Sequence, residues 1–282
     1  ITVLVGRGNN AGDGYLIAAL ALRAGWQVQV LAVGDPALLQ GDAAQARDEA
    51  LAAGVCVQPW SECATLSGVV VDALLGTGLS GAVREPYAQA IALLNASGLP
   101  VLAVDIPSGL CADSGQVLGV AVRAQLTVTL IGLKLGLFTG IAADWVGEVQ
   151  FADLQADAQL VAAQPFTAQR LAGRNVPQLP PRPRSVHKGQ LGHVLVVAGD
   201  RGFAGAGLLA AQSALRAGAG LVTLATRSEH LAAAQARVPE VMAAGVASAN
   251  QLRALGAQAS VWVVGPGLGQ AAWGRSLLSA AQ

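Results

Sequence analysis

The chain has 282 residues, of which 53% are hydrophobic and 12% are charged, and this composition excludes an intrinsically disordered protein. Seventeen basic residues balance 17 acidic ones, so the chain has no global field that would favour nucleic acid or an anionic membrane. No apolar run reaches the roughly 18 residues that a membrane-spanning helix needs, so we expect neither nucleic acid nor a membrane among its partners.

The first half of the chain repeats a strand–turn–helix pattern. An apolar run at residues 1–5 is followed by a glycine-rich turn at 6–14 and by an Ala/Leu-rich helix that ends at Gly25. A helix is predicted from Tyr87 to Gly98. Further strands are predicted at residues 28–33, 69–75, 100–104, 126–130 and 148–151. Such units build a parallel sheet, and the predicted fold class is therefore α/β.

A second α/β unit follows a proline-rich stretch. Prolines 177, 180, 181 and 183 lie close together, and proline stiffens the chain and removes backbone donors, so residues 156–185 are predicted to be a linker. Beyond it we expect a glycine-rich turn at 199–207 and a helix at 208–217. Strands are predicted at residues 193–198, 221–225 and 261–264. The chain is thus expected to form two domains, at residues 1–155 and 186–282.

Polar residues gather where three predicted strands end. Asn9, Asn10 and Asp13 follow the first strand, Asp72 lies at the end of a later one, and Asp105 ends the strand after that. The carboxyl ends of parallel strands meet at one edge, where open sheets bind their ligands. Short polar side chains there can bind a ligand or a hard cation, and helix N-termini hold phosphate. Three carboxylates in one pocket would repel one another unless a cation or a proton neutralises some of the charge.

Two other interpretations of these residues remain open. Gly6, Gly8 and Ala11 fit a dinucleotide-binding fingerprint, and Asp35 lies where a ribose-binding acid would fall, as in an NAD(P)-dependent oxidoreductase. A carboxylate at position 13 argues against that assignment, because it would repel a pyrophosphate. The strand-end aspartates could also be simple caps.

Three motifs in this part of the chain resemble the NAD(P)H-hydrate epimerase family. They are NNAGDG at residues 9–14, DALLGTGL with REPY at 72–79 and 84–87, and AVDIPSG at 103–109. The resemblance covers residues 1–155, implies a Rossmann-like sheet, and lacks the family's helix before the first strand. It implies interconversion of the R and S forms of NADHX or NADPHX, with Asp105 as the catalytic residue. It also implies a homo-oligomer.

The resemblance assigns the remaining site residues. A potassium ion would be ligated by Asn10, Asp72 and Ser108. The hydrated cofactor would be bound by Asn9, Asn10, Ala11, Gly12, Asp13, Gly76, Thr77, Gly78, Leu79, Ser80, Gly81, Ala82 and Asp105.

The second half of the chain is similar to the ADP/ATP-dependent NAD(P)H-hydrate dehydratases, which have a ribokinase-like fold. The motifs are HKG at residues 187–189, GHVLVVAGD at 192–200, GAG at 205–207 and VGPGLG at 264–269. The resemblance implies that Ala206 and Gly267 contact the hydrate, and that ADP or ATP is used, with Mg²⁺ as a further candidate. The family's nucleotide loop would lie downstream, so we expect a truncated domain that does not dehydrate by itself.

Together the two halves resemble a bifunctional NAD(P)H-hydrate repair enzyme. A non-catalytic epimerase-like binding module is a further alternative to the oxidoreductase. The cysteines are Cys56, Cys63 and Cys111, an odd number with no CxxC pair, and they predict reduced, buried thiols and a cytoplasmic location.

Overall fold

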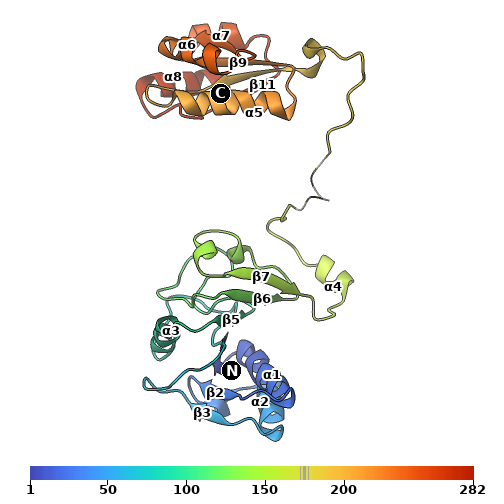
Figure 1. Ribbon diagram of the computed structural model, residues 1–282, viewed down its shortest axis with the longest axis vertical. Helices are drawn as coiled ribbons and strands as arrows, with labels where there is room; N and C mark the ends of the chain where they lie inside the picture. Colours follow the sequence, from blue (N-terminus) through green and yellow to red (C-terminus); the bar gives the residue numbers. More distant parts are fainter. Residues whose placement is uncertain (172, 174–175, 177) are drawn as a thin grey trace. The chain divides into compact units, whose positions relative to one another are not determined.

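The computed structural model describes residues 1–171, 173, 176 and 178–282, and the chain divides into two compact units at residues 1–173 and 174–282 (Figure 1). Each unit is described by itself. The proposed boundaries at 155 and 186 remain predictions, and Pro177 of the predicted linker lies outside the described residues. Within the described ranges, no helix combines the length and apolar character needed to cross a membrane.

The first unit contains a seven-stranded, entirely parallel sheet in the order β3-β2-β1-β4-β5-β6-β7. Its strands are β1 (Thr2–Val5), β2 (Gln29–Ala32), β3 (Val57–Pro59), β4 (Val70–Ala73), β5 (Val101–Val104), β6 (Leu126–Leu130) and β7 (Glu148–Ala152). The predicted α/β class with a Rossmann-like parallel sheet is confirmed. The strand order reverses between β1 and β4, and such a switch point opens a crevice at the carboxyl ends of the strands.

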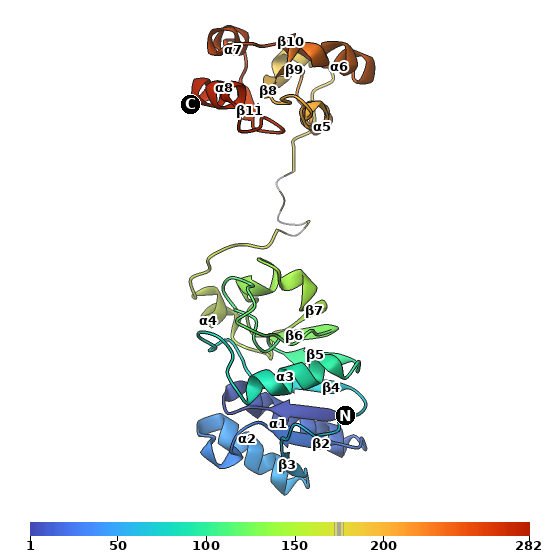
Figure 2. The ribbon, with the colours of Figure 1, turned by 90° about the vertical axis from the view of Figure 1, so that its left-hand side faces the viewer.

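Helices cover both faces of this sheet (Figure 2). The helices are α1 (Asn9–Arg23), α2 (Gly41–Ala52), α3 (Tyr87–Ala96), α4 (Ala158–Ala162) and the 3₁₀ turns η1 (Pro36–Leu38), η2 (Leu135–Leu137) and η3 (Ala142–Asp144). Val3 and Val5 pack against α1 and α2, whereas Leu4 packs with Ile91 and Leu94 of α3. Successive strand residues point to opposite faces, so the continuous apolar run in β1 is explained by burial on both sides.

The second unit contains a four-stranded parallel sheet in the order β10-β9-β8-β11. Its elements are η5 (Lys188–Leu191), β8 (His193–Val197), α5 (Ala204–Ala217), β9 (Leu221–Thr226), η6 (Ser228–His230), α6 (Leu231–Arg237), β10 (Met242–Gly245), α7 (Ala249–Gly256), β11 (Val261–Val264) and α8 (Ala272–Ala281). Leu195 and Val197 pack against α7 and α8, and Val196 packs against α5 and α6. The order again reverses next to the first strand, between β8 and β11.

Two expectations were wrong. The helix predicted at 208–217 begins four residues earlier, at Ala204, because Gly205 and Gly207 continue the helix rather than the turn. The cysteines are not buried: Cys56 and Cys63 are exposed and Cys111 is half-buried. A cysteine is buried only where its helix or strand faces the core, and Cys56 and Cys63 lie in loops.

Gly6 and Gly8 provide a matched test of the packing at the switch point. A Cβ at Gly6 would overlap the carbonyl oxygen of Leu74, whereas a Cβ at Gly8 would meet nothing within 4 Å. We expect Gly6→Ala to lower the free energy of unfolding by about 1–3 kcal/mol, the usual cost of overpacking, and Gly8→Ala to change it by less than about 0.5 kcal/mol. Urea denaturation of both variants measures this. Equal free energies of unfolding would show that the loops after β1 and β4 can move apart without loss of stability.

Candidate functional site

The reversal of strand order places a cavity of about 660 Å³ beside the carboxyl ends of β1, β4 and β5. Three loops that are distant in sequence form its walls. The lining residues are Gly8, Asn9, Asn10, Asp13, Leu74, Leu75, Gly76, Thr77, Gly78, Leu79, Ser80 and Asp105. The structure therefore brings the first and second predicted loops together with Asp105, as expected from the shared edge of the sheet.

The N-terminus of α1 opens onto this cavity. The helix begins at Asn9 after Gly8, which provides no side-chain cap, so the first backbone N–H groups of the helix have no side-chain acceptor. Asn9 is exposed, whereas Asn10 is buried and its Nδ2 donates to the carbonyl of Leu75, 3.3 Å away. An uncapped helix N-terminus in a polar cavity is suited to an anionic group such as a phosphate.

Asp72 lies in β4, fully buried beneath the cavity rather than in its wall. Its Oδ1 accepts from Ser108 Oγ at 2.6 Å and from Leu74 N at 3.2 Å, and its Oδ2 accepts from Ser108 N at 2.8 Å. Burial raises the pKa of Asp72 to about 6, although these hydrogen bonds act in the opposite direction. The predicted single pocket with three carboxylates is wrong in this respect, because only Asp13 and Asp105 line the cavity.

Ser108 also connects Asp72 to the loop after β4. Its Oγ accepts from Leu75 N at 2.8 Å, and the carbonyl of Leu75 accepts from Asn10. Asn10, Asp72 and Ser108 therefore gather around the backbone of Leu75. They offer only oxygen as ligands, which suits a hard cation. Asp72 forms no salt bridge to any residue in the described ranges, so the charge of its ionised form has no protein counter-charge.

Asp105 follows β5 in the left-handed region of the backbone, with φ of +67°. Few residues other than glycine adopt this conformation, and it is often retained at functional sites. Oδ1 of Asp105 accepts from Leu130 N at 3.0 Å, from Thr129 Oγ1 at 3.3 Å and from Lys134 Nζ. These three bonds fix the carboxylate, and in the described part of the chain no hydrogen bond uses its Oδ2.

Lys134 is a site residue to which the sequence analysis assigned no role. Its ammonium group contacts Asp105 and donates to the carbonyl of Leu130 at 2.8 Å, and both side chains of the pair are 17% exposed. Burial and the nearby charge of Asp105 raise the pKa of Asp13, while Lys134 opposes that effect. The signal was present in the sequence: Lys134 begins the KLGLFTG stretch, which follows a strand of the same sheet.

Several residues that were predicted to bind the ligand do not line the cavity. Ala11 and Gly12 are buried in the inner face of α1, and Gly81 and Ala82 are exposed beyond the cavity wall. Asp35 accepts a hydrogen bond from Ala37 N at 2.9 Å and caps η1, so one of its carboxylate oxygens has a local structural role.

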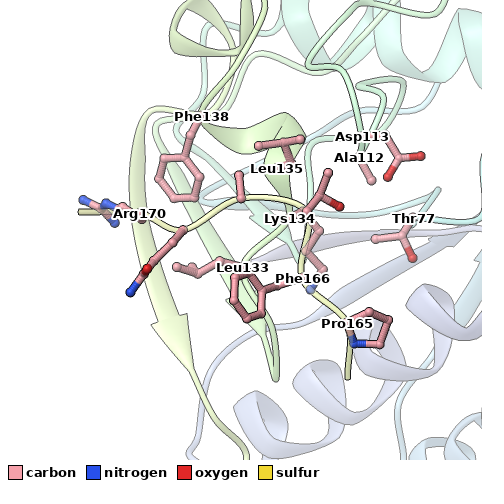
Figure 3. Close-up of a pocket in the computed structure, with 13 residues that line it drawn as sticks. Thr77, Ala112, Asp113, Leu133, Lys134, Leu135, Phe138, Pro165, Phe166 and Arg170 are labelled. Carbon is pink, nitrogen blue, oxygen red and sulfur yellow. The ribbon is translucent and has the colours of Figure 1, made fainter. Parts of the chain in front are cut away.

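A second cavity, of about 560 Å³, lies beside Lys134 in the same unit (Figure 3). The sequence analysis did not predict it. Four parts of the chain line it, with residues Thr77, Ala112, Asp113, Leu133, Lys134, Leu135, Phe138, Pro165, Phe166, Thr167, Ala168, Gln169 and Arg170. Thr77 borders both cavities, and Lys134 of this one contacts Asp105 of the other. The two cavities are therefore neighbours that meet at these residues.

In the second unit, the loops after β8 and β11 meet at the reversal of strand order. Asp200 N donates to the carbonyl of Gly267 at 2.7 Å, and Gly199 N donates to that of Pro266 at 3.0 Å. Gly267 has φ of +61°, and a Cβ there would lie 2.9 Å from Cβ of Ala206. The structure therefore brings the two predicted hydrate-binding residues, Ala206 and Gly267, side by side.

The buried Asp200 and the half-buried Arg227 form a charged pair beside these loops. Arg227 Nε donates to Asp200 Oδ1 at 2.8 Å and lowers the pKa of that carboxyl. The guanidinium also lies 4.3 Å from the ring centre of Trp273. His187, from the HKG motif, accepts from Gly189 N at 3.2 Å and caps η5, so its contact is local. The sequence analysis assigned no role to Asp200 or Arg227.

Among the residues described, no group of three or more His, Cys, Asp or Glu side chains forms a metal site. This does not bear on the Asn10, Asp72 and Ser108 cluster, in which only one ligand is a carboxylate.

Comparison with known proteins gives the same division of the chain. Residues 1–136 match the family model described as YjeF-related protein N-terminus, and residues 194–282 match that of NAD(P)H-hydrate dehydratase. The chain is 46% identical over 281 residues to the bifunctional NAD(P)H-hydrate repair enzyme Nnr of Coxiella burnetii, covering 99% of this chain and 58% of that protein. It is 42% identical to the enzyme of the same name in Escherichia coli, covering 98% and 54%.

Solved structures show weaker likenesses. The yeast protein ynu0 has 23% identity and a TM-score of 0.42, covering 48% of this chain and 59% of its own. A ribokinase-like superfamily protein from Enterococcus faecalis has 30% identity and a TM-score of 0.32, covering 36% and 37%. The chain spans 58% and 54% of the two curated relatives named above. On the sequence matches, almost the whole chain is similar to bifunctional NAD(P)H-hydrate repair enzymes.

Proposed function

We propose that the first unit interconverts the R and S forms of NADHX or NADPHX, and that the second unit takes part in nucleotide-dependent dehydration of the S form. The observation that carries the first proposal is Asp105 in the cavity wall, with Oδ1 fixed by three donors and Oδ2 without a donor from the described residues. The relatives' name and the match of both family models support the assignment.

Inverting the hydroxylated carbon of the hydrate requires a group that removes and returns a proton. In a ring-opening route, Asp105 takes the hydroxyl proton as the carbonyl forms, the ring C–N bond breaks, and its electron pair stays on the ring nitrogen, which gains a proton. Reclosure on the other face reverses these transfers. In a dehydration route, Asp105 protonates the departing hydroxyl and deprotonates the water that returns. Both routes need a carboxyl oxygen directed at the ring, and Oδ2 of Asp105 fits that requirement.

Asn10, Asp72 and Ser108 are proposed to hold a potassium ion. Their donor set consists of oxygens, and Asp72 is a fully buried carboxylate whose pKa is raised by burial. A bound cation would supply the missing counter-charge and would favour binding of the anionic cofactor at the neighbouring N-terminus of α1. The hydrate is proposed to contact the cavity through Asn9, Asn10, Asp13 and residues 76–80, with Asp105 at its reacting ring.

The second unit is proposed to bind the hydrate at Ala206 and Gly267 and to use ADP or ATP, with Mg²⁺ as a companion ion. The close approach of the β8 and β11 loops supports this placement, because their backbone bonds fix Gly267 beside α5. Phosphate transfer to the hydroxyl would make it a better leaving group. A cytoplasmic location and a homo-oligomer also remain proposals. Against the oxidoreductase alternative, one carboxylate oxygen of Asp35 is already used to cap η1.

Asp105→Asn tests the acid–base role. The amide fills the same space but cannot accept a proton at neutral pH, so we expect epimer exchange to fall about 100-fold or more while hydrate binding remains measurable. Chromatographic separation of R and S hydrates over time measures the exchange. Asp35→Asn is the matched control, since asparagine also caps well. A normal rate in the Asp105 variant would remove this residue from the proton-transfer role.

Lys134→Met tests whether the ammonium group positions Asp105. Removing one of three donors to Oδ1 should lower kcat by about 10-fold or more and leave KM nearly unchanged, since the interaction acts at the reacting group. Lys134→Arg keeps a charged donor and should recover part of the rate. If Lys134→Arg does not restore kcat, and KM rises in both variants, the role of Lys134 is structural instead.

Replacing potassium with tetramethylammonium tests the cation site. Without an ion that fits among Asn10, Asp72 and Ser108, we expect weaker hydrate binding and a smaller rise in melting temperature on adding the hydrate. Thermal unfolding with and without hydrate, in each salt, measures this. Ser108→Ala should reduce the difference between the salts. Identical melting shifts in both salts would contradict the proposed site.

A further inference from the structure

The two cavities of the first unit differ in chemical character. The cavity at the strand ends contains the uncapped N-terminus of α1, the polar residues Asn9 and Asp13, and the carboxylate of Asp105. The neighbouring cavity has two aromatic side chains and two leucines in its wall, together with polar and charged residues that include Asp113, Lys134 and Arg170 (Figure 3). The first therefore suits phosphate and a polar reacting ring, and the second suits a flat, partly apolar ring system.

Aromatic residues from two separate segments face the second cavity. Phe138 follows η2 and is 42% exposed, and Phe166 lies beyond α4 and is 78% exposed. Arg170 places its guanidinium 4.8 Å from the ring centre of Phe138, so this arginine is already arranged as a flat, stacked surface. Large exposed aromatic side chains around a cavity are uncommon unless something covers them. Figure 3 shows Phe138 and Phe166 on two different segments of the chain.

The first cavity accounts for only part of a hydrated dinucleotide. If the reacting ring meets Asp105 and a phosphate meets the N-terminus of α1, the purine nucleoside half remains to be placed. Thr77 borders both cavities and Lys134 links them, so the second cavity is directly adjacent to that arrangement. Its aromatic side chains suit a purine, because stacking depends on a flat ring rather than on a particular hydrogen-bond pattern.

We propose that the cavity formed by residues 133–138 and 165–170 binds the adenosine half of the hydrated dinucleotide, with Phe138 and Phe166 as its stacking surfaces. This inference rests on the proposed epimerase function and adds the residues that recognise the non-reacting half of the substrate. It also gives the segment after α4 a role in the first site, although the matching family model covers only residues 1–136.

The experiment compares a whole and a shortened substrate. Phe166→Ala should raise KM for NADHX about 10-fold, the effect of losing one base-stacking partner, with kcat within about twofold of wild type. The hydrate of reduced nicotinamide mononucleotide lacks the adenosine half, so the same variant should leave its KM within about twofold. Phe166 is 78% exposed, so its truncation does not threaten the fold. Leu160→Ala is the control, since Leu160 is 67% exposed and lies outside the cavity wall.

Calorimetric titration with AMP separates this inference from the proposed function. We expect AMP to bind the wild-type chain and to bind Phe166→Ala about 10-fold more weakly. A wild type that exchanges no hydrates but shows this AMP difference would overturn the epimerase proposal and support an adenosine site. Equal KM changes for both substrates would place Phe166 at the reacting half and overturn the inference. Unchanged KM and AMP affinity in Phe166→Ala would also overturn it.

Discussion

The carboxylate of Asp72 holds the first site together. It accepts hydrogen bonds from the backbone and hydroxyl of Ser108 and from the backbone of Leu74, and Ser108 in turn accepts from Leu75. Asn10 donates to the carbonyl of Leu75, so one buried network joins the loops that follow β1, β4 and β5. Losing one partner of a buried, hydrogen-bonded charge costs far more than losing a surface contact. The positions of the cavity walls therefore depend on this network.

The carboxylates of Asp72 and Asp105 are kept in different environments, which suits different tasks. Asp72 is fully buried without a counter-charge in the described chain, and burial raises its pKa to about 6. Asp105 is partly exposed and paired with Lys134, and its backbone is held in the left-handed region. Contrasting environments of this kind often separate a structural or cation-binding acid from a reacting one. Burial and, after it, the charge of Asp105 raise the pKa of the neighbouring Asp13, and the charge of Lys134 opposes this rise.

The sequence predicted the sheet better than the details of the site. Apolar runs bounded by glycine located β1, β4, β6, β8 and β11 within one or two residues. This worked because a strand that is buried on both faces consists almost entirely of apolar residues. Short elements such as β3, α4 and β10 were missed, since they are exposed and depend on tertiary packing. The contact of Lys134 with Asp105 could not be derived either. It joins residues 29 positions apart through the register of β5 and β6.

The two units share a topology, but the negative charge of the buried aspartate at the reversal of strand order is balanced differently in each. In each sheet the strand order reverses beside the first strand, and glycine-rich loops from both sides of that point meet. In the second unit, Asp200 lies there with Arg227, whose guanidinium also stacks on Trp273, so the counter-charge is part of the protein. In the first unit, Asp72 has only neutral donors around it. A buried carboxylate with neutral donors can be neutralised by a proton or by an added cation. The oxygens of Asn10 and Ser108, gathered with Asp72 around the backbone of Leu75, favour the cation, and this is why a potassium ion is proposed as the counter-charge of Asp72.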